Sequence, residues 1–366
     1  MRKLTLVTAL LLVGAGFLFA NGTHESTAGS QANGTVSGTI GILMPSIVVA
    51  RWAQDADSMI ADAKKVGLQT EVQYADDKIE NQVAQIENMI TKGYKALIVC
   101  PVDATALGNV LQETKAAGIP VISYDRLIKN TKNVDYYLTF DNVHVGEVCG
   151  QYIVDKLGLA NGKGPYNLEI FTGDIADNNA TMTYQGGMNV LQKYIDNKQL
   201  IVRSGQTALQ QVATPHWGGA EAQARMDNIM SAYYTNAHLD VIFSTYGGMS
   251  LGCIASLKAL GYGTPKIPMP LITAQDAEKA ITIAVARGDL SMSIFKDTRL
   301  LAQNAIDIAV SCIKGQKVQL DESKFYDNGA FKVPTFLAAV NPFDKDTLDK
   351  TVIDTGYWTH ADIYGN

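Results

Sequence analysis

The sequence has few cysteines, few histidines and no excess of positive charge, and each shortage excludes a class of protein. Four cysteines among 366 residues do not make a disulfide scaffold. No two of them have the spacing of metal ligands and the five histidines are scattered, so we expect no metal site. The 30 basic and 36 acidic side chains give a net charge of −6, which argues against a nucleic-acid-binding surface.

The cysteines stand in apolar surroundings, which predicts how they are used. We expect buried free thiols rather than disulfides at all four positions, Cys100, Cys149, Cys253 and Cys312. Hydrophobic residues make up 47% of the chain and charged residues 18%, which is enough apolar material for one large core or two medium ones.

One long apolar run stands at the start of the chain. Arg2 and Lys3 precede the run at residues 4–19, and Ala20 follows it. This order is typical of a secretory signal peptide over residues 1–20, and the alternative is an uncleaved membrane anchor. No cysteine lies near the expected cleavage site, which argues against lipid attachment. No second such run follows, so we expect no membrane span in the mature chain.

Residues 21–38 are small, polar and rich in glycine, which predicts a flexible tether. Beyond it, apolar runs typical of strands alternate with segments of helical periodicity. This alternation predicts an α/β fold with two doubly wound, mostly parallel-sheet lobes. The expected strands are 36–44, 70–74, 95–100, 120–124, 136–140, 167–172, 201–204, 239–243, 271–273, 291–296 and 333–340, and the expected helices are 52–66, 80–91, 105–117, 180–195, 221–234, 249–260, 277–286 and 300–313.

Polar and aromatic side chains gather where the predicted strands end, which is where open parallel sheets bind ligands. Carboxylates and amides supply hydrogen-bond acceptors there, arginine and lysine supply donors, and indole rings can cover an apolar face. A sugar ring offers the matching groups, because its hydroxyls are donors and acceptors above an apolar C–H face. The candidate ligand-binding residues are Arg51, Trp52, Asp125, Arg126, Asp177, Asn179, Trp217, Tyr246, Asp276 and Lys296.

Several stretches resemble one family of proteins. They are VARWAQD (49–55), QYADD (73–77), QIENMITKGYKALIV (85–99), SYDRLI (123–128), TFDNVHVG (139–146), DNNA (177–180), AQARMDNIMSAYYT (222–235), AQDAE (274–278) and IFKDTRLLA (294–302). The chain is similar in these to the periplasmic sugar-binding proteins of bacterial ABC importers (type I periplasmic binding proteins), in the xylose-binding and multiple-monosaccharide-binding branch.

The resemblance implies two lobes joined by three crossings, with a monosaccharide enclosed between them. It implies an N-terminal lobe of 36–141 plus 289–317 and a C-terminal lobe of 142–288 plus 318–366. The sugar contacts carried over are Arg51, Asp125, Arg126, Asn179, Trp217, Asp276 and Lys296, with Trp52 and Asp177 as further candidates. The implied protein is a periplasmic monomer without cofactor or catalytic activity, which closes around its sugar and delivers it to ABC transporter permease subunits.

Two positions depart from the family pattern and leave the sugar open. Relatives usually carry an aspartate where this chain reads Tyr246-Gly247, and often an arginine where it has His216. Tyr246 can contact a ligand through its ring or its hydroxyl. The candidate ligands are aldopentoses and aldohexoses, such as xylose, arabinose, glucose or galactose. Delivery to a chemotaxis receptor or a sensor kinase is equally compatible with the sequence.

Two other interpretations are a hydrolytic enzyme and a transcription regulator. Residues 248–252, GMSLG, match the pattern of a serine nucleophile, so a secreted hydrolase would use Ser250, with Asp276 and His360 following in chain order. A glycosidase would need a carboxylate pair, available among Asp76, Asp77, Asp174 and Asp177. A transcription regulator would need a basic DNA-binding segment at the front of the chain, where the signal peptide and tether stand instead.

Overall fold

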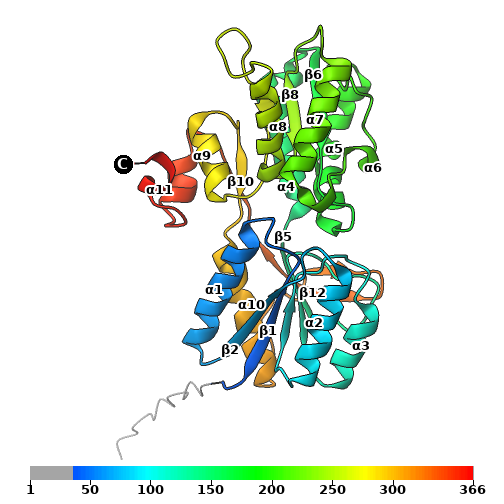
Figure 1. The fold of residues 1–366 in the computed structure, drawn as a ribbon, viewed down its shortest axis with the longest axis vertical. Coiled ribbons are helices and arrows are strands. Elements are labelled where there is room, and N and C mark those ends of the chain that lie inside the picture. The colour runs from blue at the N-terminus through cyan, green and yellow to red at the C-terminus, as the bar shows by residue number, and fades with distance from the viewer. Residues whose placement is uncertain (1–35, 366) are drawn as a thin grey trace, which may run out of the picture. The chain divides into compact units, whose positions relative to one another are not determined.

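A computed structural model describes residues 36–365, which form α-helices packed on parallel sheets (Figure 1). The expected signal peptide and almost all of the expected tether therefore lie outside the described residues. No helix among residues 36–365 is long and apolar enough to cross a membrane.

The first sheet has seven strands in the order β11-β12-β5-β4-β3-β1-β2, all parallel to their neighbours except β11. The strands are β1 (Thr39–Met44), β2 (Gln69–Tyr74), β3 (Leu97–Val99), β4 (Val121–Tyr124), β5 (Tyr136–Phe140), β11 (Phe325–Asp327) and β12 (Lys332–Ala338). Helices α1 (Arg51–Lys65) and α10 (Thr298–Ile313) cover one face, and α2 (Ile79–Thr91) and α3 (Gly108–Ala116) cover the other (Figure 1). We call this unit the N-terminal lobe.

The central strands of this sheet are apolar on both faces because helices bury both. Ile42 and Leu43 are neighbours in β1, and both are fully buried. Successive side chains of a strand point to opposite faces. Ile42 accordingly joins the cluster with α1 and α10, and Leu43 joins the cluster with α2 and α3. This double burial confirms the predicted doubly wound arrangement.

The second sheet is smaller and has the order β7-β6-β8-β9, with all strands parallel. Its strands are β6 (Tyr166–Phe171), β7 (Leu200–Ile201), β8 (Val241–Ser244) and β9 (Leu271–Ile272), and β10 (Ser293–Phe295) pairs with β13 (Asn341–Phe343) in a separate antiparallel ribbon. Its helices are α4 (Asn142–Leu157), α5 (Asn178–Asp196), α6 (Leu209–Val212), α7 (Gly219–Tyr233), α8 (Gly247–Ala259), α9 (Lys279–Arg287) and α11 (His360–Tyr364), with short turns η1 (Leu159–Asn161), η2 (Pro215–Trp217) and η3 (Asp349–Ile353). We call this unit the C-terminal lobe.

The strand pairing corrects the expected division of the chain. Residues 318–366 were expected in the C-terminal lobe, but β12 pairs in parallel with β5 from Thr335–Tyr137 to Ala338–Phe140, so β11 and β12 belong to the first sheet. Residues 289–317 were expected in the N-terminal lobe, but β10 lies beside the end of β9, where Asp276 N–H donates to the Ile294 carbonyl at 2.9 Å. The chain thus crosses between lobes after β5, between β10 and α10, and after β12.

Helix α4 was not predicted, although it is 16 residues long. Its glycines lower helix propensity, but they are required because α5 packs directly against its backbone. A Cβ at Gly146 would lie 2.0 Å from the Thr183 carbonyl oxygen, and one at Gly186 of α5 would lie 1.9 Å from the Val143 carbonyl oxygen. The two helices therefore approach each other through small residues.

The cysteine prediction is confirmed within the described residues. All four cysteines are free, and Cys100, Cys149 and Cys253 are buried while Cys312 is partly buried. Among residues 36–365, no group of three or more histidine, cysteine or acidic side chains is arranged to hold a metal ion.

The close approach of α4 and α5 makes a prediction for stability. The change Gly186→Ala places a methyl group against backbone that cannot move aside, so we expect the free energy of unfolding to fall by about 1–3 kcal/mol or more. Gly108→Ala at the start of α3 is the control, because a Cβ there has no atom within 4 Å. Equal denaturation midpoints of the two variants in urea would contradict this account of the helix contact.

Candidate functional site

All ten residues selected from the sequence line a single cavity where the two lobes meet. The lining consists of Val49, Arg51, Trp52, Asp125, Arg126, Asp177, Asn179, Trp217, Tyr246, Gln275, Asp276 and Lys296. The space between these residues that no atom occupies is about 340 Å³, part of it open to solvent. The cavity therefore suits a small ligand rather than a polymer.

The strand ends explain why residues distant in sequence meet here. Arg51 and Trp52 open α1 in the loop region after β1, and Asp125 and Arg126 follow β4 directly. Lys296 follows β10 in the C-terminal lobe. The carboxyl ends of parallel strands share one edge of a sheet, so both lobes present these polar residues to the same cavity.

Arg51 is the centre of the charged network. Its guanidinium donates to Asp125 at 2.7 Å and to Asp55, one turn further along α1, at 3.2 Å. It also lies 3.6 Å from Asp276 of the C-terminal lobe. Arg51 is buried, and these three carboxylates, Asp125 first, hold its pKa well above the usual value against the effect of burial.

Further polar contacts join the two lobes across the cavity. Asn179 donates from its amide nitrogen to the Asp125 backbone oxygen at 3.0 Å and to its carboxylate at 3.2 Å. Arg126 Nε lies 3.0 Å from Asp177 Oδ2. Together with the approach of Arg51 to Asp276, these contacts bring each lobe against the other, so the structure represents a closed arrangement.

Asp177 also has a structural task. Its Oδ1 caps α5 by accepting from the backbone N–H of Asn179 at 2.9 Å. Burial raises the pKa of Asp177, and the nearby Arg126 opposes the rise. Asp177 therefore fixes both the start of α5 and the position of Arg126.

The formal charges that line the cavity balance. The three cations are Arg51, Arg126 and Lys296, and the three carboxylates are Asp125, Asp177 and Asp276. Lys296 lies 3.7 Å from Asp276 and donates to the side chain of Asn142, at the start of α4, at 3.2 Å. A balanced set of buried charges offers hydrogen bonds to a neutral ligand without selecting for an ionic one.

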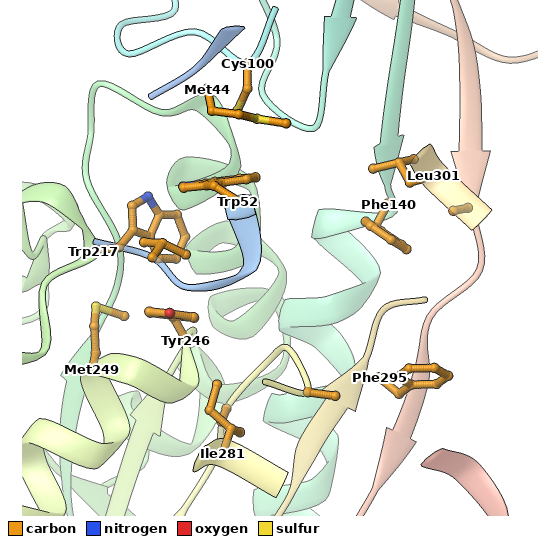
Figure 2. Packing of buried hydrophobic residues seen from close by; sticks show 14 of the residues in the cluster. Met44, Trp52, Cys100, Phe140, Trp217, Tyr246, Met249, Ile281, Phe295 and Leu301 are labelled. Atoms are coloured by element: carbon orange, nitrogen blue, oxygen red, sulfur yellow. The ribbon is translucent and has the colours of Figure 1, made fainter. Parts of the chain in front are cut away.

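Aromatic rings supply the apolar part of the lining (Figure 2). The guanidinium carbon atoms of Arg51 and Arg126 lie 4.8 and 5.4 Å from the centre of the Trp52 ring. Trp217 meets Tyr246 edge to face with ring centres 6.0 Å apart. A Cβ at Gly173 would lie 2.1 Å from the Trp217 ring, so only glycine leaves room for this indole. The rings are held rigidly and can cover the apolar face of a ligand.

Several buried polar atoms at the cavity have no hydrogen-bond partner within the protein. The donors are Arg51 Nε, Trp52 Nε1 and Trp217 Nε1, and the acceptors are Gln275 Oε1 and Asp276 Oδ1. Buried polar groups are normally paired. Since the lining holds both unpaired donors and unpaired acceptors, the fitting ligand carries groups that do both, as hydroxyls do.

The backbone at the site is itself unusual. Asp125, Trp217 and Asp276 have positive φ values of 59°, 57° and 74°. Side chains other than glycine rarely adopt this left-handed conformation, and it gathers at sites where the surrounding structure enforces a functional geometry. At Asp125, hydroxyls of Tyr137 and Thr139 each donate to the backbone oxygen at 2.9 Å and fix the turn.

Two buried carboxyls behind the cavity were not selected from the sequence. Asp55 is fully buried and also accepts from the Tyr124 hydroxyl at 2.9 Å. Its spacing of four residues from Arg51 on one helix is the signal that could have found it. Burial raises the pKa of Asp55 to about 6, although the charge of Arg51 opposes this. Glu278 lies behind Tyr246 and Asp276, in the AQDAE stretch.

The geometry does not support the serine-nucleophile alternative. Ser250 is buried within α8, and its hydroxyl is hydrogen-bonded to Ser244 and to the backbone oxygens of Tyr246 and Thr273 at 2.9–3.0 Å. A serine nucleophile needs a base within hydrogen-bond reach. No histidine among residues 36–365 is hydrogen-bonded to Ser250, and His360 is exposed at the start of α11.

The carboxylates considered for a glycosidase are used in other ways. Of the four, only Asp177 lines the cavity. Asp174 accepts from the backbone N–H groups of Ala176 and His216. The His216 ring is exposed, 3.9 Å from Asp77 and 4.0 Å from Asp174, and it does not line the cavity.

The sequence matches a known protein family and several of its members. The model of the periplasmic binding protein domain matches residues 40–317. The chain is 46% identical over 321 residues to a multiple sugar-binding periplasmic receptor of Rhizobium radiobacter, covering 88% of this chain and 91% of that protein. It is 32% identical to a D-xylose-binding periplasmic protein of Escherichia coli, covering 88% and 92%.

Solved structures agree with the sequence comparison. An ABC transporter solute-binding protein from Clostridium phytofermentans with bound β-D-glucose is 41% identical, with a TM-score of 0.84, covering 89% of this chain and 99% of that one. A carbohydrate transporter solute-binding protein from Chloroflexus aurantiacus in complex with D-glucose is 30% identical, with a TM-score of 0.81, covering 90% and 98%.

The buried position of Asp55 predicts a pH dependence of stability. The pKa of Asp55 is higher in the folded protein than in the unfolded chain, so folding is coupled to the uptake of a proton. The free energy of unfolding of wild type therefore falls as the pH rises towards about 6. The variant Asp55→Asn does not titrate, so between pH 4 and 6 its stability should improve relative to wild type by about 1 kcal/mol per pH unit. Urea denaturation across this range measures the difference. Asp57→Asn, exposed on the same helix, is the control, and parallel curves for wild type and Asp55→Asn would refute the assignment.

Proposed function

The chain belongs to the periplasmic binding protein family, and from this we propose that it is the substrate-binding protein of an ABC sugar importer. It binds one monosaccharide between its lobes and delivers it to the permease subunits in the membrane. The observation that carries the proposal is the cavity between the lobes in which balanced charges, rigid indoles and unpaired donors and acceptors meet.

The mechanism follows from the contacts between the lobes. When the lobes separate, Asp125 and Asp276 lose their partners on the opposite lobe and become hydrated. A sugar that enters offers hydroxyls to the unpaired atoms of Trp52, Trp217 and Gln275, and these groups come from both lobes. The sugar therefore binds the closed form more tightly than the open form and shifts the population towards closure. The chain's residues bind and orient the sugar, and no covalent bond changes.

The relatives narrow the class of ligand. Two solved relatives are described with bound D-glucose, and another relative is named for D-xylose. We therefore propose an aldohexose or an aldopentose, with glucose and xylose as the first sugars to test, ahead of arabinose and galactose. No electrostatic feature of the cavity favours a sugar acid, since its three cations and three carboxylates balance.

The start of the sequence supports a periplasmic location. Residues 1–20 have the order of a secretory signal peptide, and the relatives are periplasmic proteins. Export then places the protein, as a monomer, where a membrane permease can receive the closed form. The same closed form suits a chemotaxis receptor or a sensor kinase, because either partner would read the same change of lobe arrangement.

Truncation of carboxylates tests the site. Asp276→Ala and Asp125→Ala each leave Arg51 with fewer partners and remove an acceptor for a hydroxyl. We expect the dissociation constant for the preferred sugar to rise by about 30-fold or more, because removing one member of a buried charged pair costs about 2–5 kcal/mol. Asp289→Ala, in an exposed pair with Lys258, should change the affinity by less than about threefold.

Isothermal calorimetry measures these affinities after a thermal-shift panel of aldohexoses and aldopentoses has identified the sugar, since a ligand of the folded form raises the melting temperature. Unchanged affinity in both site variants would show that the sugar does not bind in this cavity. A wild-type protein that no monosaccharide stabilises would overturn the function itself, as would recovery of a chemically altered sugar.

A further inference from the structure

Glu278 stands directly behind the cavity wall without lining the cavity. It precedes α9 and is only 5% exposed. Its Oε1 accepts a hydrogen bond from the Tyr246 hydroxyl at 2.9 Å, whereas its Oε2 is buried without a partner in the protein. A carboxyl buried in this way is normally held by an opposite charge, but its hydrogen-bond partner here is a neutral phenol.

The hydrogen bond decides which part of Tyr246 the cavity meets. Its hydroxyl donates its only proton to Glu278, so it offers no donor to a ligand, and the ring remains for contact with a ligand's apolar face. The ring packs on Gly248, where a Cβ would lie 2.4 Å from it. It also forms the edge-to-face pair with Trp217 (Figure 2). Packing alone therefore limits the ring on one side, and the hydroxyl anchor limits it at the far end.

We propose that Glu278 is a positioning residue of the sugar site, which fixes the Tyr246 ring, and through it the Trp217–Tyr246 wall, and so determines which monosaccharides fit. The inference rests on the proposed function, since it concerns the selectivity of the same site. An aromatic wall contributes by rigid contact with the C–H face of a sugar. If the ring can turn, the wall fits several sugars comparably and discriminates less between them.

The surroundings of Glu278 favour the neutral form of its carboxyl. Burial, followed by the charge of Asp276 two residues away, raises the pKa of Glu278 to about 8. The Tyr246 hydrogen bond and the more distant charge of Arg51 act in the opposite direction and lower the pKa of Glu278. A charge on Glu278 would also act on the Tyr357 phenol, whose pKa it raises. A protonated Glu278 avoids repulsion with Asp276, and its ionisation would place a second negative charge beside Asp276 in the closed site.

Three variants separate this role from a general effect on folding. Glu278→Leu removes the acceptor, Glu278→Gln keeps an acceptor that cannot ionise, and Tyr246→Phe keeps the ring without its hydroxyl. Calorimetry with glucose, xylose, galactose and arabinose gives the affinity and the ratio between the tightest and weakest sugar. Glu113→Leu on the exposed surface of α3 is the control, and melting curves without sugar confirm that each variant is folded.

We expect Glu278→Leu and Tyr246→Phe each to weaken the best sugar by about tenfold and to compress the ratio between sugars, because each loses the same buried hydrogen bond. Glu278→Gln should recover most of the affinity and selectivity. The double variant Glu278→Leu/Tyr246→Phe should lose no more than Glu278→Leu alone, since the two side chains act through one interaction.

The pH profile provides a readout that a merely structural role would not move. The protonated form is the one that fits the closed site, so wild-type affinity should decline at least about threefold as the pH rises from 6 towards about 8 and should level off above that pH. Glu278→Gln cannot ionise and should keep a flat profile over this range. The pH profiles of wild type and Glu278→Gln therefore test the positioning role even if Glu278→Leu does not fold.

The outcomes distinguish this inference from the proposed function. If wild type binds sugar, but the variants retain its sugar preference and Glu278→Gln shows the same pH profile as wild type, the positioning role is overturned and the importer function stands. If wild type binds no monosaccharide at any pH, the proposed function fails first.

Discussion

A single buried guanidinium holds the site together. Arg51 is within 3.6 Å of Asp55, Asp125 and Asp276, which come from its own helix, from the end of β4 and from the opposite lobe. An isolated cation could not be buried at such a place, because its loss of hydration would be too large. Asp55 and Asp125 lie in the same lobe as Arg51 and pair with it in either arrangement, whereas Asp276 joins them only when the lobes close, so closure completes the pairing of Arg51.

The remaining polar groups follow from this constraint. Arg51 pairs with several of the carboxylates. Arg126 pairs with Asp177 and Lys296 with Asp276, so the positive and negative charges of the lining balance. The atoms left over are indole N–H groups and amide or carboxylate oxygens. They define a ligand by its hydroxyls rather than by its charge, and the fixed rings of Trp52 and Trp217 define where its apolar face can lie.

The sequence predicts the fold class and the residues that line the cavity, but it does not predict every helix or strand pairing. The end of each parallel strand is recognisable from its apolar run, and Asp125 or Lys296 could be placed in the site from that position alone. Helix α4 was missed because Gly146 and Gly150 weaken its signal, although they are needed for contact with α5. The pairing of β12 with β5 is a long-range choice that no local pattern encodes. Glu278 could not be selected either, because its role depends on the direction of the Tyr246 hydroxyl.

The return of β12 to the first sheet has a consequence for synthesis. The N-terminal lobe is made of residues from both ends of the chain, since β12 at Lys332–Ala338 completes a sheet begun at Thr39. A growing polypeptide cannot close that sheet until nearly all of the C-terminal lobe has been made. Pairing over such a sequence separation is slow, so the completion of this sheet is expected to be a late step in folding.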